Sequence, residues 1–128
     1  MNTETEVVRS FYQKLKVGDA EGALSLLSSD IEWTTMWHYK VLGRTPQHVA
    51  EGLFKPLMAE WSSFSFLATD FIAEGDTVVS LGTFVGSHGA TGKEVEARYA
   101  HVWNINDGKI IRFRQYIDTL AVAQARQE

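Results

Sequence analysis

The chain has 128 residues, of which 45% are hydrophobic and 12% aromatic, and its formal net charge is −4 at pH 7. This length suits one domain, expected to span residues 1–128, and the hydrophobic share is enough for a core. The absence of cysteine excludes disulfides and thiol chemistry. Without a basic stripe or a long apolar run, neither nucleic acid nor a membrane is an expected partner. Because the N-terminus lacks a signal pattern, we expect a cytoplasmic location.

The first half of the chain reads as helices. An amphipathic helix ending near Gly18 is predicted from apolar residues at every fourth position, Val7, Phe11 and Leu15. Asp19 is placed to cap a second, short helix. A third helix is predicted to begin at Pro46, with a kink at Pro56, whose ring would press on the carbonyl four residues earlier.

A short strand, "DIEWTT", lies before the third helix and is followed by the loop "MWHYKVLGR". Exposed aromatic side chains on a loop are costly, so Trp37 and Tyr39 are expected to fold over a pocket. From Ser62 onward the pattern changes to strands separated by glycine-containing turns. The last residues, "LAVAQARQE", read as a short helix or a frayed tail. Helices first and antiparallel strands second indicate the α+β class.

The stretch "RYAHVWNINDGKIIRFRQYIDT", residues 98–119, reads as a β-hairpin with two alternative registers. A two-residue loop would place His101 opposite Arg114, and a three-residue loop ending at Gly108 would place it opposite Phe113. We favour the second register because it separates apolar from polar side chains far better. His101 and Gln115 then both point to the apolar, inward face.

The outward face of this hairpin mixes arginines with apolar residues, Val102, Ile110 and Tyr116. That composition fits a protein interface better than an ordinary solvent-facing surface, so a homodimer through the outer sheet face is expected. On the inward face, an unpaired polar group would cost about 1–3 kcal/mol. His101 and Gln115 must therefore be satisfied by each other, by a tyrosine, by water or by a ligand.

Three segments together resemble the SnoaL-like, ketosteroid-isomerase-related branch of the NTF2-like superfamily. They are "GDAEGALSLLSSDIEW", the Gly-Arg-Thr-Pro helix start, and "AHVWNINDGKIIRFRQYIDT". The resemblance implies an α+β, cone-shaped barrel, in which three N-terminal helices pack in a strongly curved, mostly antiparallel sheet. It also implies one deep apolar pocket and, commonly, a homodimer.

The acids and bases of the enzymes in this family are not retained here. At the positions matching the tyrosine, the aspartate base and the protonated aspartate of the steroid isomerases, this chain has Phe11, Thr35 and His101. The polyketide cyclases pair a histidine, which resembles His101, with an aspartate whose position is taken by Gln115. A glutamine cannot accept a proton. The resemblance therefore supports the fold and its pocket, but it supports neither the steroid isomerase reaction nor the polyketide cyclase reaction.

We therefore predict a protein with an apolar pocket for a small cyclic or aromatic metabolite. One hypothesis is isomerase- or cyclase-type proton transfer, with His101 as the catalytic group. The alternative is a non-catalytic ligand-binding protein or a dimeric scaffold, in which His101 contacts a ligand or is a neutral core residue. The candidate ligand-binding residues are Tyr12, Trp37, His38, Tyr39, Tyr99, Trp103, Phe113 and Gln115. No cofactor is expected, and no metal, because the four histidines lack ligand spacing.

Overall fold

The structure is a computed structural model, and it describes residues 3–128. Five strands form one sheet in the order β1-β5-β4-β3-β2, in which β1 runs parallel to β5 and every other pair is antiparallel. The elements in chain order are α1 (Thr3–Lys16), α2 (Ala20–Ser25), β1 (Leu27–Thr35), α3 (Pro46–Val49), η1 (Ala50–Phe54), α4 (Lys55–Glu60), β2 (Trp61–Glu74), β3 (Thr77–His88), β4 (Glu94–Asn106), β5 (Lys109–Ile117) and α5 (Thr119–Arg126).

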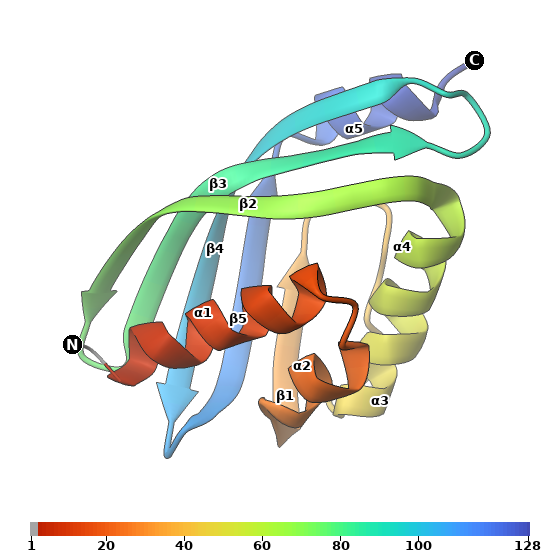
Figure 1. Cartoon of the computed structure of the whole chain (residues 1–128). Coiled ribbons are helices and arrows are strands. Elements are labelled where there is room, and N and C mark those ends of the chain that lie inside the picture. Colours follow the sequence, from red (N-terminus) through yellow and green to blue (C-terminus); the bar gives the residue numbers. More distant parts are fainter. Residues whose placement is uncertain (1–2) are drawn as a thin grey trace.

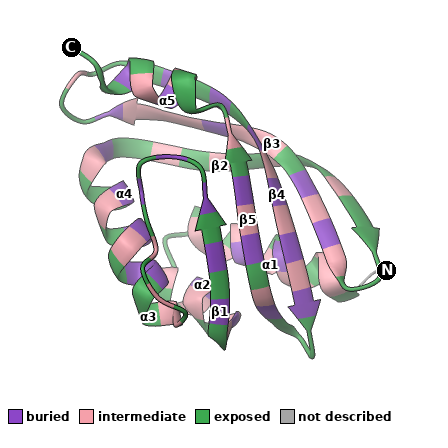
Figure 2. Cartoon of the chain, turned by 180° about the vertical axis from the view of Figure 1, so that it is seen from behind, coloured by how far each residue is buried: buried purple, intermediate pink, exposed green. Residues whose placement is uncertain are grey.

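The sheet is strongly curved, and α1 to α4 lie within its concave side (Figure 1). Register shifts between Ala68 and Asp70 in β2 and between Asn104 and Ile105 in β4 mark irregularities of the kind that bend strands. Seen from behind, buried residues alternate with half-buried and exposed ones along β4 and β5 (Figure 2). The α+β architecture predicted from the sequence is confirmed, with the apolar sides of sheet and helices facing each other.

The predicted kink in the third helix takes the form of a π-helical turn. Thr45 caps the segment by accepting a hydrogen bond from the His48 backbone N–H, and the chain stays helical to Glu60. Within it the Lys55 N–H donates to the carbonyl of Ala50, five residues earlier. Pro56 has no N–H to continue the α-helical pattern, which is the physical reason for a wider turn here.

The hairpin between β4 and β5 differs from the predicted register. Asp107 and Gly108 both have positive φ values, 54° and 77°, so they form a two-residue turn rather than part of a three-residue one. A bulge follows, after which His101 lies opposite Gln115 instead of Phe113. The bulge also exchanges two isoleucines: Ile110 is buried, contrary to its predicted outward position, whereas Ile111 is half-buried.

Despite this shift, His101 and Gln115 point inward as predicted, and both are buried. The C-terminal residues form the helix α5, capped by Asp118 through the Ala121 N–H, rather than a frayed tail. None of the helices among residues 3–128 has both the length and the apolar character needed to cross a bilayer.

Candidate functional site

A row of polar side chains crosses the inward face of the sheet. Strand pairing sets Thr35 of β1 beside Gln115 of β5, Gln115 beside His101 of β4, and His101 beside Ser80 of β3. All four side chains are buried. Tyr12, from α1, reaches down to this row from the opposite wall. Four strands and one helix therefore contribute to a single polar cluster inside an otherwise aromatic core.

These side chains are joined by short hydrogen bonds. Gln115 Oε1 lies 2.7 Å from His101 Nε2, and Gln115 Nε2 donates to Thr35 Oγ1 over 2.7 Å. On the other side of the ring, His101 Nδ1 lies 2.5 Å from the Tyr12 hydroxyl, which is 2.7 Å from Ser80 Oγ. The indole N–H of Trp103 completes the chain by donating to Ser80 Oγ over 2.9 Å.

The directions of these bonds follow from the donor inventory. Because the Gln115 amide nitrogen donates to Thr35, its carbonyl oxygen accepts, and His101 Nε2 must carry the proton. Nδ1 of a neutral imidazole is then an acceptor, which the Tyr12 hydroxyl satisfies. Tyr12 in turn accepts from Ser80, whose oxygen accepts from Trp103. Each of the joined atoms has its partner, so the cluster satisfies itself without a ligand.

The cluster is uncharged at neutral pH. Burial lowers the pKa of His101 to about 3, although its hydrogen bond with Gln115 acts in the opposite direction. Burial likewise raises the pKa of the Tyr12 hydroxyl well above its usual range, with a further contribution from Tyr99. His101 is therefore a neutral imidazole and Tyr12 a neutral phenol. Neither group is poised to exchange a proton with a substrate near pH 7.

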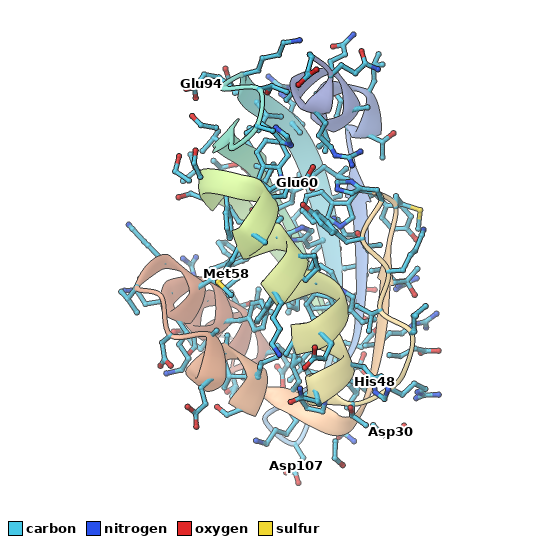
Figure 3. All side chains as sticks on the ribbon, turned by 90° about the vertical axis from the view of Figure 1, so that its right-hand side faces the viewer. Asp30, His48, Met58, Glu60, Glu94 and Asp107 are labelled. Atoms are coloured by element: carbon cyan, nitrogen blue, oxygen red, sulfur yellow. The ribbon has the colours of Figure 1, made fainter. Side chains whose placement is uncertain are left out.

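A cavity of about 70 Å³ lies beside this cluster, between the sheet and the helices. Its wall is mostly aromatic and aliphatic and contains no Asp or Glu among the described residues. The lining residues are Phe11, Tyr12, Leu15, Gly18, Ala20, Trp33, Thr35, Trp37, Leu53, Phe54, Leu57, Met58, Phe64, Phe66, His101, Trp103, Phe113 and Gln115. Met58, 55% exposed, projects from α4 toward α1 and α2 and forms part of the rim (Figure 3).

Six of the nine residues singled out from the sequence lie in this wall: Tyr12, Trp37, His101, Trp103, Phe113 and Gln115. Tyr99 does not line the cavity. Its ring stacks on His101 with a centroid separation of 3.8 Å, and burial raises the pKa of its hydroxyl to about 12. It is therefore a support for the His101 ring rather than a surface that a ligand in the cavity would touch.

His38 and Tyr39, the other two, belong to a second polar cluster around Glu60 at the end of α4 (Figure 3). The Glu60 carboxylate accepts hydrogen bonds from Tyr39, over 2.5 Å, and from His38, over 2.7 Å. It also accepts from His88 of β3, over 2.9 Å, and from Arg126 of α5, over 2.6 Å. Partial burial opposes its ionisation, but these four donors outweigh that effect and lower the pKa of Glu60.

The Glu60 cluster fastens the loop after β1 and the C-terminal helix to the sheet. Apart from the adjacent His38 and Tyr39, its members are distant in sequence and follow no common spacing, so the sequence pattern did not indicate that Glu60, His88 and Arg126 join them. Thr35 and Ser80 were likewise not assigned to the inner cluster, since their place beside Gln115 and His101 depends on strand register. Within residues 3–128, no three His, Asp or Glu side chains are placed to hold a metal ion.

Comparison with known proteins agrees with this architecture. Residues 8–113 match the model of the SnoaL-like domain. An NTF2-like protein from Burkholderia thailandensis is 35% identical over the full length of both chains, with a TM-score of 0.91. TerC, co-crystallized with polyporic acid, is 25% identical, with a TM-score of 0.85 over 97% of this chain and 98% of its own.

A more distant structure has the same fold. IdmH from Streptomyces antibioticus, a putative polyketide cyclase, is 16% identical, with a TM-score of 0.84 over 98% of this chain and 99% of its own. None of the curated proteins matches the chain significantly. The domain match covers most of the chain, and the 35% identical structure covers all of it, so the protein belongs to the SnoaL-like family of the NTF2-like fold.

Proposed function

We propose that this protein binds a small, flat and mainly apolar molecule in the cavity, and that it does so without using His101 as a catalytic base. The observation that carries this proposal is the inner cluster, in which His101 and Tyr12 are neutral and already paired. No carboxylate among the described residues lines the cavity. An aromatic wall with a few polar groups is the usual composition of a small-molecule site.

The cavity volume of about 70 Å³ is below the roughly 300 Å³ at which small-molecule sites begin. Ligand entry therefore requires side chains at the rim to move. Met58 is the candidate, because an exposed side chain has little packing to lose when it moves. Methionine is also the most adaptable apolar side chain, because it is unbranched and has three rotatable bonds. TerC, co-crystallized with polyporic acid, supports the view that this fold accommodates a small molecule.

Proton transfer on an enolisable ketone is the second candidate function, and the 2.5 Å contact between Tyr12 and His101 favours it. In that case the Tyr12 oxygen would take the proton from the substrate carbon while the Tyr12 hydroxyl proton passes to His101 Nδ1. The low pKa of His101 argues against this role, since an effective base has a pKa near the working pH. Turnover that disappears in His101→Gln would establish the enzyme and overturn the binding-only proposal.

The binding proposal is tested by calorimetric titration with small aromatic probes, using 2-naphthol as the first. Met58→Phe fills the rim with a larger side chain at an exposed position, so we expect the fold to persist and the affinity to fall. Met58→Leu, of similar volume, is the matched control and should bind as the unmodified protein does. Equal binding by all three proteins would show that the probe does not enter through this rim, and the proposal would be abandoned.

A homodimer through the outer sheet face remains part of the proposal. This face exposes three large apolar side chains, Ile72, Leu81 and Tyr116. A second copy would cover these apolar side chains.

A further inference from the structure

We propose that the groove between α1 and β2 binds an anionic group, so that the ligand is an aromatic carboxylate or similarly acidic ring compound. This inference rests on the proposed function, because the ring is taken to occupy the cavity. The groove has a volume of about 550 Å³. Its lining residues are Arg9, Tyr12, Gln13, Leu15, Lys16, Phe64, Ser65, Phe66, Leu67, Ala68 and Phe71.

The groove and the cavity share part of their walls. Tyr12 and Leu15 of α1 and Phe64 and Phe66 of β2 line both. Tyr12 presents its hydroxyl to the inner cluster, and its ring lies edge-on to Phe71, with centroids 6.2 Å apart, on the side of the groove. A molecule that passes between these four side chains would have one end in the cavity and the other in the groove. The larger volume of the groove provides the space that the cavity lacks.

The charge of the groove is opposite to that of the whole chain. Arg9 and Lys16 line it, and its described lining contains no Asp or Glu, although the chain has a net charge of −4. The two cations are seven residues apart on α1, so they are about 10 Å apart along the same helix face, with Gln13 between them. Among residues 3–128, neither forms an ion pair with a carboxylate.

Arg9 is also held in position. Its guanidinium carbon lies 4.2 Å from the centroid of the Phe71 ring, in a cation–π contact. An arginine packed on an aromatic face keeps the N–H groups at its edge available, and these match the two oxygens of a carboxylate. A neutral ligand would leave both cations hydrated and gain nothing from them. The geometry therefore favours a ligand with an apolar ring and an anionic edge.

The test is calorimetric titration of the full chain at low ionic strength with benzoate, 2-naphthoate and biphenyl-4-carboxylate, each beside its methyl ester. We expect at least one acid to bind about tenfold more tightly than its ester, and added salt to reduce this difference. Arg9→Gln should remove most of the preference, measured as the ratio of acid affinity to ester affinity within the variant. Lys55→Gln, on α4 and paired with Glu51, is the control and should keep the preference.

The outcomes separate this inference from the proposed function. If the esters bind as tightly as the acids, or Arg9→Gln keeps the full preference, the anion site is refuted while ligand binding in the cavity stands. If neither acids nor esters bind, both proposals fail together. An acid preference that Arg9→Gln removes and Lys55→Gln retains supports both.

Discussion

The burial of His101 predicts that the protein loses stability as the pH falls from 7 to 5. In the folded chain the pKa of His101 is about 3, whereas the ordinary value is 6.5. Below pH 6.5 the unfolded chain therefore binds a proton at this residue that the folded chain does not bind. Stability rises with pH wherever the unfolded state holds more protons, so the contribution of His101 is fully present above pH 6.5 and is lost toward pH 3.

The magnitude follows from the two pKa values. With 6.5 for the unfolded chain and a neutral ring in the folded one, this single group lowers the free energy of unfolding by about 2 kcal/mol between pH 7 and pH 5. The limiting slope is about 1.4 kcal/mol per pH unit. Glu60, whose pKa is lowered from 4.5 in the folded chain, makes its contribution at more acidic pH, so this window isolates the histidine from it.

Urea unfolding at several pH values between 5 and 7 measures this slope. His101→Gln removes the titrating ring. Between pH 7 and pH 5 its free energy of unfolding should therefore fall by about 2 kcal/mol less than that of the unmodified protein, whatever the stability of the variant at pH 7. Identical slopes for the unmodified protein and His101→Gln, or an NMR titration of the His101 ring with a midpoint above pH 5, would refute the assignment of a buried neutral imidazole.

Three further predictions concern single side chains. Tyr12→Phe leaves His101 Nδ1 without its donor and should lower the free energy of unfolding by about 1–3 kcal/mol in urea titrations, whereas Tyr116→Phe, at the surface, should not. Glu60→Gln removes the carboxylate charge that accepts from four donors, and it should lower the melting temperature and increase amide exchange in α5. Glu51→Gln, which removes one member of an exposed ion pair, should have neither effect. Tyr116→Asp places a charge on the outer sheet face and should give monomers by light scattering. Leu42→Asp, on an exposed loop, should leave the dimer intact. A monomer found for the unmodified protein would contradict the proposed interface.

The sequence was informative about the fold because one signal, the apolar pattern, acts on every element. Apolar residues recur every fourth position after Thr3, and the structure has the helix α1 there. Apolar and polar residues alternate in the strands after Ser62, and buried and exposed positions alternate along β4 in the same way. The inward orientation of His101 and Gln115 was predicted for the same reason, since any register that separates apolar from polar side chains places both inside.

The register itself was not predictable from that signal. It depends on Asp107 adopting positive φ and on a bulge near Ile111, and the two together shift the pairing while keeping the apolar face nearly unchanged. Aspartate tolerates the left-handed region but does not require it, so the sequence leaves both turns open. As a result, the inner pair was predicted, and its partners Thr35 and Ser80, set by neighbouring strands, were not.

The cavity and the groove differ in charge, and this difference fits the two roles that we propose for them, binding of an apolar ring and binding of an anionic group. The interior offers Tyr12, His101 and Gln115 as a neutral, fully bonded cluster, which positions the aromatic wall and carries no charge for catalysis. Arg9 and Lys16, which form no ion pair with a carboxylate among residues 3–128, line the groove outside the cavity, where the anionic group of the proposed ligand would bind. A site built for proton transfer would place its ionisable groups in the cavity and shift their pKa values toward neutrality. Here the pKa values of His101 and Tyr12 are shifted away from neutrality, and the two cations line the groove, which is the arrangement that the proposed binding of an anionic ring compound requires.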